Sequence, residues 1–189
     1  MKILYTLGHY VYCGHQVLMY TINAKNEPTE EYQTETEKCF AASLAPMRQM
    51  FKPMNELEGM NAEPPIVGDV IWTHTSGNQY IAAGIWQENG NSPINFDAIR
   101  FICRSVIRKA QELEQIVVSM PLITREDDLD LWNFIYPIIE DEFKGIDIQV
   151  IVHIPTEEKL LAVLDNMGGE FNELQRNPPE IRFAQSKKE

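Results

Sequence analysis

An alternation of short apolar runs with helical segments, between residues 67 and 155, constrains the fold of this chain more than any other feature. The predicted elements are strands at 70–74 and 80–86, a helix at 94–113, a strand at 116–120, a helix at 129–143 and a strand at 148–154. The run at 116–120 stops at Pro121 and is typical of a strand buried on both faces. Such alternation predicts a sheet covered by helices, with ligands at strand ends that face helix N-termini.

The first third of the chain predicts two more strands and a helical region. The strands lie at 2–6 and 16–22, and the second runs into the turn Asn23-Ala24-Lys25-Asn26. The acidic stretch at 27–36 predicts a loop or a helix lead-in. Helical spacing follows over 37–51, and Pro46 inside it predicts a kink or two short helices.

The end of the chain predicts one more helix and a tail. The helix begins at 156–158, where two glutamates complement the backbone dipole, and stops at Gly168-Gly169. The residues from 170 to 189 include two adjacent prolines and predict an extended or frayed tail. We therefore expect one domain over 1–169 followed by this tail.

Charge and cysteine usage exclude several classes of function. The chain carries 28 acidic and 16 basic residues, a net charge of −12, which repels phosphate backbones and anionic membranes. Generic nucleic-acid binding is therefore not expected, although a local basic site stays open. Cys13, Cys39 and Cys103 are an odd number without CxxC spacing, which favours reduced thiols in the cytoplasm and predicts neither a metal site nor a cofactor. No apolar run is long enough for a signal peptide or a membrane span, so no membrane association is expected.

The order of the segments resembles that of a macro domain, the module that binds ADP-ribose. The likeness is best over residues 68–154, and its nearest branch removes ADP-ribose from acidic side chains. The segments that carry it are GDVIW and GNQYIAAGIWQ, FDAIRFICRSVIRKAQEL, VVSMPLI with LDLWNFIYPIIEDEF, and IDIQVIVHIP. The resemblance implies an α/β fold with three layers, α/β/α, around a mixed six-stranded sheet.

The resemblance also implies which residues would bind a nucleotide. Asn23 and Asn26 would contact a ribose through their amides. The alternative is a turn that uses asparagine for its backbone tolerance.

The loop after the strand at 116–120 would hold the phosphates and the catalytic acid. Pro121, Thr124 and Arg125 would bind the ligand, and Asp128 aligns with the acid that serves as a base in the de-ADP-ribosylating branch. A cap for the helix at 129–143 is the alternative role of Asp128.

Three departures from the family pattern affect the predicted site. Two ligand loops are glycine-rich in the family. In this chain they have the sequences EPTEE, at 27–31, and ITREDD, at 123–128, which contain no glycine. Gln87 stands where the branch has its attacking lysine, and an amide cannot form a Schiff base. We still predict Gln87 to contact the ligand. His9 matches the acid that reads the adenine amino group.

Two functional hypotheses follow from this pattern. In the first, the chain recognises ADP-ribose, a related nucleotide or an ADP-ribosylated macromolecule. Weak hydrolysis without a covalent lysine stays open under this hypothesis. In the second, the fold has lost the nucleotide site, and its acidic segments at 27–37 and 126–130 bind a protein partner, as an inhibitor or a nucleic-acid mimic would.

Overall fold

The computed structural model describes residues 3–52, 64–124 and 129–166. Its elements, in chain order, are β1 (Leu4–Leu7), the 3-10 helix η1 (Tyr10–Tyr12), β2 (Val17–Asn23), α1 (Glu31–Cys39), α2 (Ala41–Gln49), β3 (Val70–His74), β4 (Tyr80–Gln87), α3 (Phe96–Glu112), β5 (Val117–Pro121), α4 (Asp130–Phe143), β6 (Gln149–Ile154) and α5 (Glu157–Asn166). The predicted tail at 170–189 lies outside the described residues.

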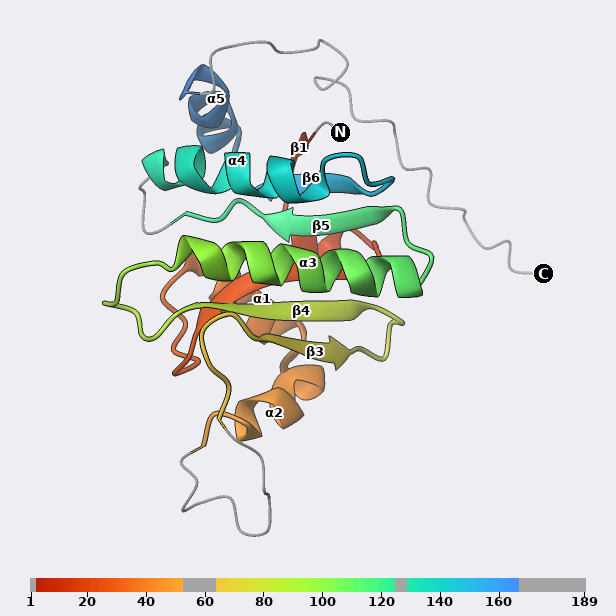
Figure 1. Ribbon diagram of the computed structural model, residues 1–189, viewed down its shortest axis with the longest axis vertical. Coiled ribbons are helices and arrows are strands. Elements are labelled where there is room, and N and C mark those ends of the chain that lie inside the picture. The colour runs from red at the N-terminus through yellow and green to blue at the C-terminus, as the bar shows by residue number, and fades with distance from the viewer. Residues whose placement is uncertain (1–2, 53–63, 125–128, 167–189) are drawn as a thin grey trace, which may run out of the picture.

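The six strands form one mixed sheet in the order β1-β6-β5-β2-β4-β3 (Figure 1). Strand β3 pairs with β4 in antiparallel fashion, and every other neighbouring pair is parallel. The carboxyl ends of the five parallel strands therefore lie along one edge. The predicted mixed six-stranded sheet is confirmed.

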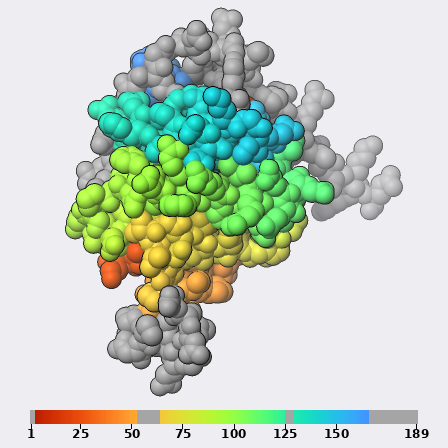
Figure 2. Space-filling model, in the orientation of Figure 1, coloured from red at the N-terminus to blue at the C-terminus, as the bar shows by residue number. Residues whose placement is uncertain are grey.

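Helices α3 and α4 cover one face of the sheet, and Figure 2 shows them in contact across that face. The predicted stripe of α3 is buried against β4, where a Cβ on Gly84 would lie 2.6 Å from a side-chain atom of Ile102. Glycine at this position allows the helix to approach the strand closely. Glu142 of α4 binds Arg100 and Arg104 of α3 at 2.7 to 3.1 Å.

The opposite face is covered by η1, α1 and α2, and in Figure 1 α1 lies behind β4 and α2 below β3. Leu18 and Tyr20 of β2 are fully buried there, together with Leu44 of α2 and Tyr10 of η1. The hydroxyl of Tyr10 bonds to that of Thr36 in α1. The three-layer α/β/α fold class is confirmed.

The helical region before residue 52 differs from its prediction. It forms two helices, but they separate at Phe40 and not at Pro46, which lies inside α2. The stretch at 31–36, predicted as a loop or lead-in, is already helical. Helix α1 buries the polar side chains of Gln33 and Thr36, so it lacks the apolar stripe that predicts a helix.

Two further predictions about helices are corrected. The sequence predicts Ser92-Pro93 as the cap and first-turn proline of the helix at 94–113, but α3 is capped by Asn95, whose Oδ1 accepts the amides of Asp97 and Ala98. Pro137 predicts a kink or a break into two pieces in the helix at 129–143, but α4 does not break there and packs on α3 and the sheet as one helix. Within the described ranges, no helix has the length and apolar character to cross a membrane.

Candidate functional site

A crevice lies at the edge of the sheet where β1, β5 and β6 end. Its walls come from the residues after these strands, the first turns of α1 and one residue of α5: Gly8, His9, Tyr10, Pro121, Leu122, Thr124, His153, Pro155, Glu30, Glu31, Tyr32, Glu35 and Lys159. It encloses about 60 Å³, the space of a few water molecules. The carboxyl ends of parallel strands are the usual place for ligands in α/β folds.

The turn after β1 places a histidine in the crevice. Gly8 has φ +127°, a conformation that side chains rarely adopt, and its amide donates to the carbonyl of Ile154 at 2.8 Å. His9, the next residue, contacts the carboxylate of Glu35 through Nδ1. The carboxylate of Glu35 therefore lies beside His9, the residue that matches the acid in the family resemblance.

The N-terminus of α1 is closed by its own side chains. A capping box joins Glu30 and Gln33, and Gln33 Oε1 accepts the amides of Thr29 and Glu30 at 2.7 and 3.2 Å. These amides already have acceptors, and Glu30, Glu31 and Glu35 make the surroundings negative. The arrangement disfavours a phosphate at this helix end.

A second hollow continues the crevice along the same edge. It is lined by Lys25, Glu27, Thr29, Glu30, Asn89, Gly90 and Asn91, and it shares Glu30 with the crevice. A Cβ on Gly90 would lie 2.7 Å from Thr29, so glycine lets the loop after β4 approach the loop after β2. The two hollows together follow the ends of β1, β6, β5, β2 and β4.

The structure places the predicted ligand residues in different surroundings. Pro121 and Thr124 line the crevice. Arg125 and Asp128 lie outside the described residues.

Asn23 is buried in the turn after β2. Its Oδ1 accepts the amides of Lys25 and Glu27 at 3.0 and 3.1 Å, and its Nδ2 donates to the carbonyl of Glu27 at 2.8 Å. Asn26 has φ 52° in this turn. Neither asparagine is among the residues that line the two hollows.

Gln87 ends β4 beside Asn23, and its carbonyl accepts the amide of Ala24 at 2.9 Å. Its side chain is 2% exposed, and Oε1 has no hydrogen-bond partner within the described part of the chain. It lines a separate hollow beside the first turn of α3, with Ser92 and Asn95. Of the predicted ligand residues that the structure describes, Pro121 and Thr124 therefore line the crevice and Gln87 lines a different hollow.

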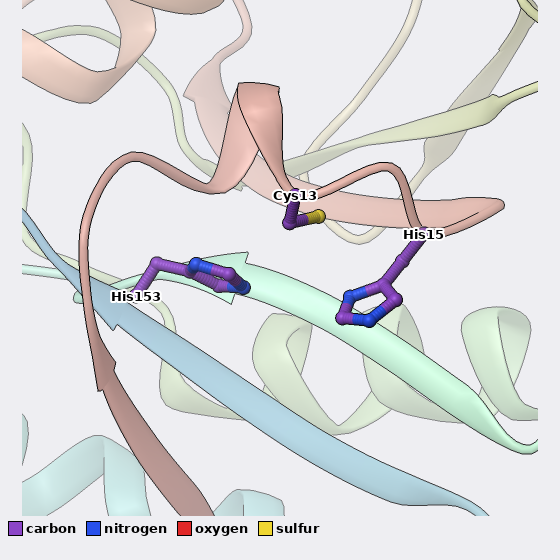
Figure 3. A group of neighbouring side chains, drawn as sticks. All are labelled: Cys13, His15 and His153. Atoms are coloured by element: carbon purple, nitrogen blue, oxygen red, sulfur yellow. The ribbon is translucent and has the colours of Figure 1, made fainter. Parts of the chain in front are cut away.

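A buried polar cluster that the sequence analysis missed lies on the η1 face of the sheet (Figure 3). Ser119 of β5 is fully buried, and its Oγ lies 2.5 Å from His15 Nδ1 and 3.2 Å from His153 Nε2. The sulfur of Cys13 lies within 4.8 Å of a nitrogen of each of these two rings. The spacing Cys13-Gly14-His15 was the available signal, but His153 is far away in the sequence.

Burial sets the protonation of this cluster. Desolvation, with the nearby His15, lowers the pKa of His153 to about 4. Desolvation also lowers the pKa of His15 and raises that of the Cys13 thiol. At neutral pH the cluster therefore holds two neutral imidazoles and a protonated thiol.

Comparison with known proteins identifies the fold. No protein-family model matches the sequence, and no curated protein matches it. A macrodomain protein from Streptomyces coelicolor has a TM-score of 0.64 at 18% identity, over 80% of this chain and 98% of that one. The Oceanobacillus iheyensis macrodomain with ADP has a TM-score of 0.65 at 14% identity, over 86% of this chain and 88% of that one.

A third match is the Trypanosoma brucei macrodomain in complex with ADP-ribose. Its TM-score is 0.60 at 10% identity, over 88% of this chain and 69% of that one. The chain therefore has the macrodomain fold, in a strongly diverged sequence.

Proposed function

We propose that this protein recognises ADP-ribose or a related nucleotide, free or attached to a macromolecule, along the carboxyl edge of its sheet. The observation that carries the proposal is the pair of hollows that share Glu30 in their linings and follow the ends of five strands. The macrodomain fold supports it, because structures with this fold contain ADP or ADP-ribose.

The residues suggest an orientation for the nucleotide. In the family resemblance His9 matches the acid that reads the adenine amino group. The carboxylate of Glu35, which contacts His9, can accept such a hydrogen bond in its place. Lys159 lines the crevice and Lys25 lines the second hollow, and they offset part of the charge of the four glutamates that line the two hollows. The described crevice is smaller than a nucleotide pocket of at least about 300 Å³, so binding requires it to widen.

The proposal concerns the binding of ADP-ribose, and it does not include hydrolysis through a covalent lysine intermediate. Gln87 occupies the lysine position of the resemblance, and its amide is not a nucleophile. Hydrolysis is tested separately, by incubating an ADP-ribosylated protein with this chain and measuring the released ADP-ribose by chromatography.

Calorimetric titration with ADP-ribose tests the binding proposal. We expect saturable micromolar binding, a free energy of about 8 kcal/mol. His9→Ala should weaken it about tenfold, through the loss of one polar contact. His74→Ala is the matched control, because His74 is an exposed histidine at the end of β3 that bonds to Asn78. Absence of heat at millimolar ligand, with wild-type protein that is folded, would contradict the proposal.

A second function is favoured by the acidic lining of the crevice. The capped N-terminus of α1 and its three glutamates fit a basic protein surface better than a phosphate. Glu31→Lys with Glu35→Lys should then abolish capture of a basic partner from cells. Asp147→Lys, exposed in the loop before β6, should retain it. Failure to recover any stoichiometric partner would count against this function.

A further inference from the structure

Three side chains with metal-binding atoms meet on the η1 face of the sheet. Cys13 and His15 come from the segment before β2, and His153 comes from β6. The thiol sulfur and a nitrogen of each ring all lie within 4.8 Å of one another. Figure 3 shows the three groups above β5, directed toward the space between them.

Two of the three groups meet at one atom, and the third lies beside them. His15 Nδ1 and His153 Nε2 lie 2.5 and 3.2 Å from Ser119 Oγ, and the Cys13 sulfur lies within 4.8 Å of a nitrogen of each ring. The sheet fixes two members of the cluster, because Ser119 pairs with Ile151 and Leu18, and His153 lies two residues after Ile151. The shared contact with Ser119 directs both imidazoles toward one point, as expected for a preorganised set of ligands.

We propose that Cys13, His15 and His153 bind one zinc ion. One thiolate with two imidazoles is a donor set that zinc takes, whereas calcium and magnesium require oxygen ligands. No carboxylate of the described residues belongs to the group. Three protein ligands also leave a fourth position open, as in zinc sites that hold a water molecule.

Ion binding requires a small contraction of the cluster. Zinc bonds of about 2.0 to 2.3 Å at tetrahedral angles set the ligand atoms about 3.4 to 3.6 Å apart, which is less than the 4.8 Å limit of the group. Cys13 and His15 are half-buried and flank Gly14, so this segment can close on the ion. The thiol proton is released to solvent as the Zn–S bond forms, and the Ser119 hydroxyl gives up its contacts with the ring nitrogens.

This proposal does not rest on nucleotide binding. It replaces the expectation of no metal site, which followed from the absence of CxxC spacing. The fold brings His153 to Cys13 and His15, which are 140 and 138 positions earlier in the sequence, and spacing rules do not detect such a set.

Titration of the chelator-treated full chain with Zn²⁺, and separately with Co²⁺, tests the proposal. We expect one equivalent of either ion per chain and a thiolate-to-cobalt absorption band. Cys13→Ser should lose this band and bind zinc about a hundredfold more weakly, and His153→Gln should weaken zinc binding to a similar degree. Cys39→Ser and His74→Gln, which change an exposed cysteine and an exposed histidine, should bind as wild type does.

Two results would overturn the proposal. One is the absence of stoichiometric zinc and cobalt binding, which would leave the cluster as a hydrogen-bond network only. The other is equal zinc affinity in wild type and Cys13→Ser, which would show an adventitious ion. Near-ultraviolet circular dichroism in chelator checks that each variant is folded. If His153→Gln does not fold, Cys13→Ser and His15→Gln, at half-buried positions, decide the question.

Discussion

Asn23 shows how one side chain can hold a turn at the carboxyl edge of the sheet. It is fully buried at the end of β2, and its amide bonds to the backbone of Lys25 and Glu27. Removal of the side chain breaks three hydrogen bonds at the end of a buried strand, each worth about 1 kcal/mol. The loop shape between β2 and α1 therefore depends on this residue.

We predict that Asn23→Ala lowers the free energy of unfolding by about 2 to 3 kcal/mol, measured by urea denaturation. Asn89→Ala is the matched control. The Oδ1 of Asn89 accepts one amide, that of Asn91, in a more exposed loop, and its loss should cost about 0.5 kcal/mol. Equal stability of the two variants would contradict this account.

The sequence predicted that asparagines end β2 but not which atoms they bind. Residue type gives the donors and acceptors of the Asn23 side chain. Its partners depend on how the backbone folds between Asn23 and Glu27, which the sequence pattern does not show. The same limit applies to Ser119, which reads as part of an apolar strand and becomes the centre of the Cys13, His15 and His153 cluster only when β5, β6 and the η1 segment are assembled.

At the scale of elements, α3 and α4 are joined by a charged contact. Glu142 has a side chain that is 9% exposed and accepts hydrogen bonds from Arg104 and Arg100. Arg104 first, and then Arg100, lower the pKa of the Glu142 carboxyl below its ordinary value. The carboxylate therefore stabilises the folded state more than the unfolded one.

This contact predicts a pH dependence of stability. Because the folded-state pKa is depressed, the contribution is complete above the ordinary carboxyl pKa and is lost as pH falls through the lower folded-state value. Glu142→Gln should cost about 1 kcal/mol at pH 7 and should flatten the loss of stability below about pH 4.5. Urea midpoints measured across this range check the result. Glu112→Gln, which breaks an exposed pair with Lys109, should change neither quantity.

The packing of α3 on β4 predicts a second effect at this scale. In Gly84→Ala the new methyl group meets three atoms of Ile102 at 2.6 to 2.8 Å, and such overpacking costs about 1 to 3 kcal/mol. Ile102→Ala in the same chain should recover about 1 kcal/mol relative to the sum of the two single changes. Gly77→Ala, whose nearest atoms are at 3.7 Å, is the control. If the free-energy changes of Gly84→Ala and Ile102→Ala simply add in the double variant, the close contact between positions 84 and 102 is refuted.

Hydrophobic periodicity predicted the elements that bury an apolar stripe, and it failed where a helix buries polar groups. Helix α3 was expected because its stripe is continuous. Helix α1 buries Gln33 and Thr36, which bond to the carbonyls of Thr21 and Tyr32 at 2.7 and 2.6 Å. A helix that is held by such bonds lacks the periodic apolar residues by which a helix is predicted from sequence.

For the whole molecule, the two hydrophobic clusters share one sheet and should unfold together. Leu44→Ala on the α2 side and Ile135→Ala on the α4 side remove fully buried side chains. Each should lower the free energy of unfolding by about 2 to 5 kcal/mol within a single transition. Circular dichroism and tryptophan fluorescence should give coincident urea curves. Leu161→Ala, at a 53% exposed position, should cost much less, and separated transitions in either core variant would contradict one cooperative unit.

His153 belongs at once to the wall of the crevice and to the buried cluster beneath it. Two ligands that contact the same imidazole are thermodynamically linked: if one changes the affinity of the other by some factor, the second changes the affinity of the first by the same factor. If both proposed ligands bind, we expect the affinity for nucleotide to depend on bound zinc, so a titration with nucleotide should be carried out at a defined zinc content.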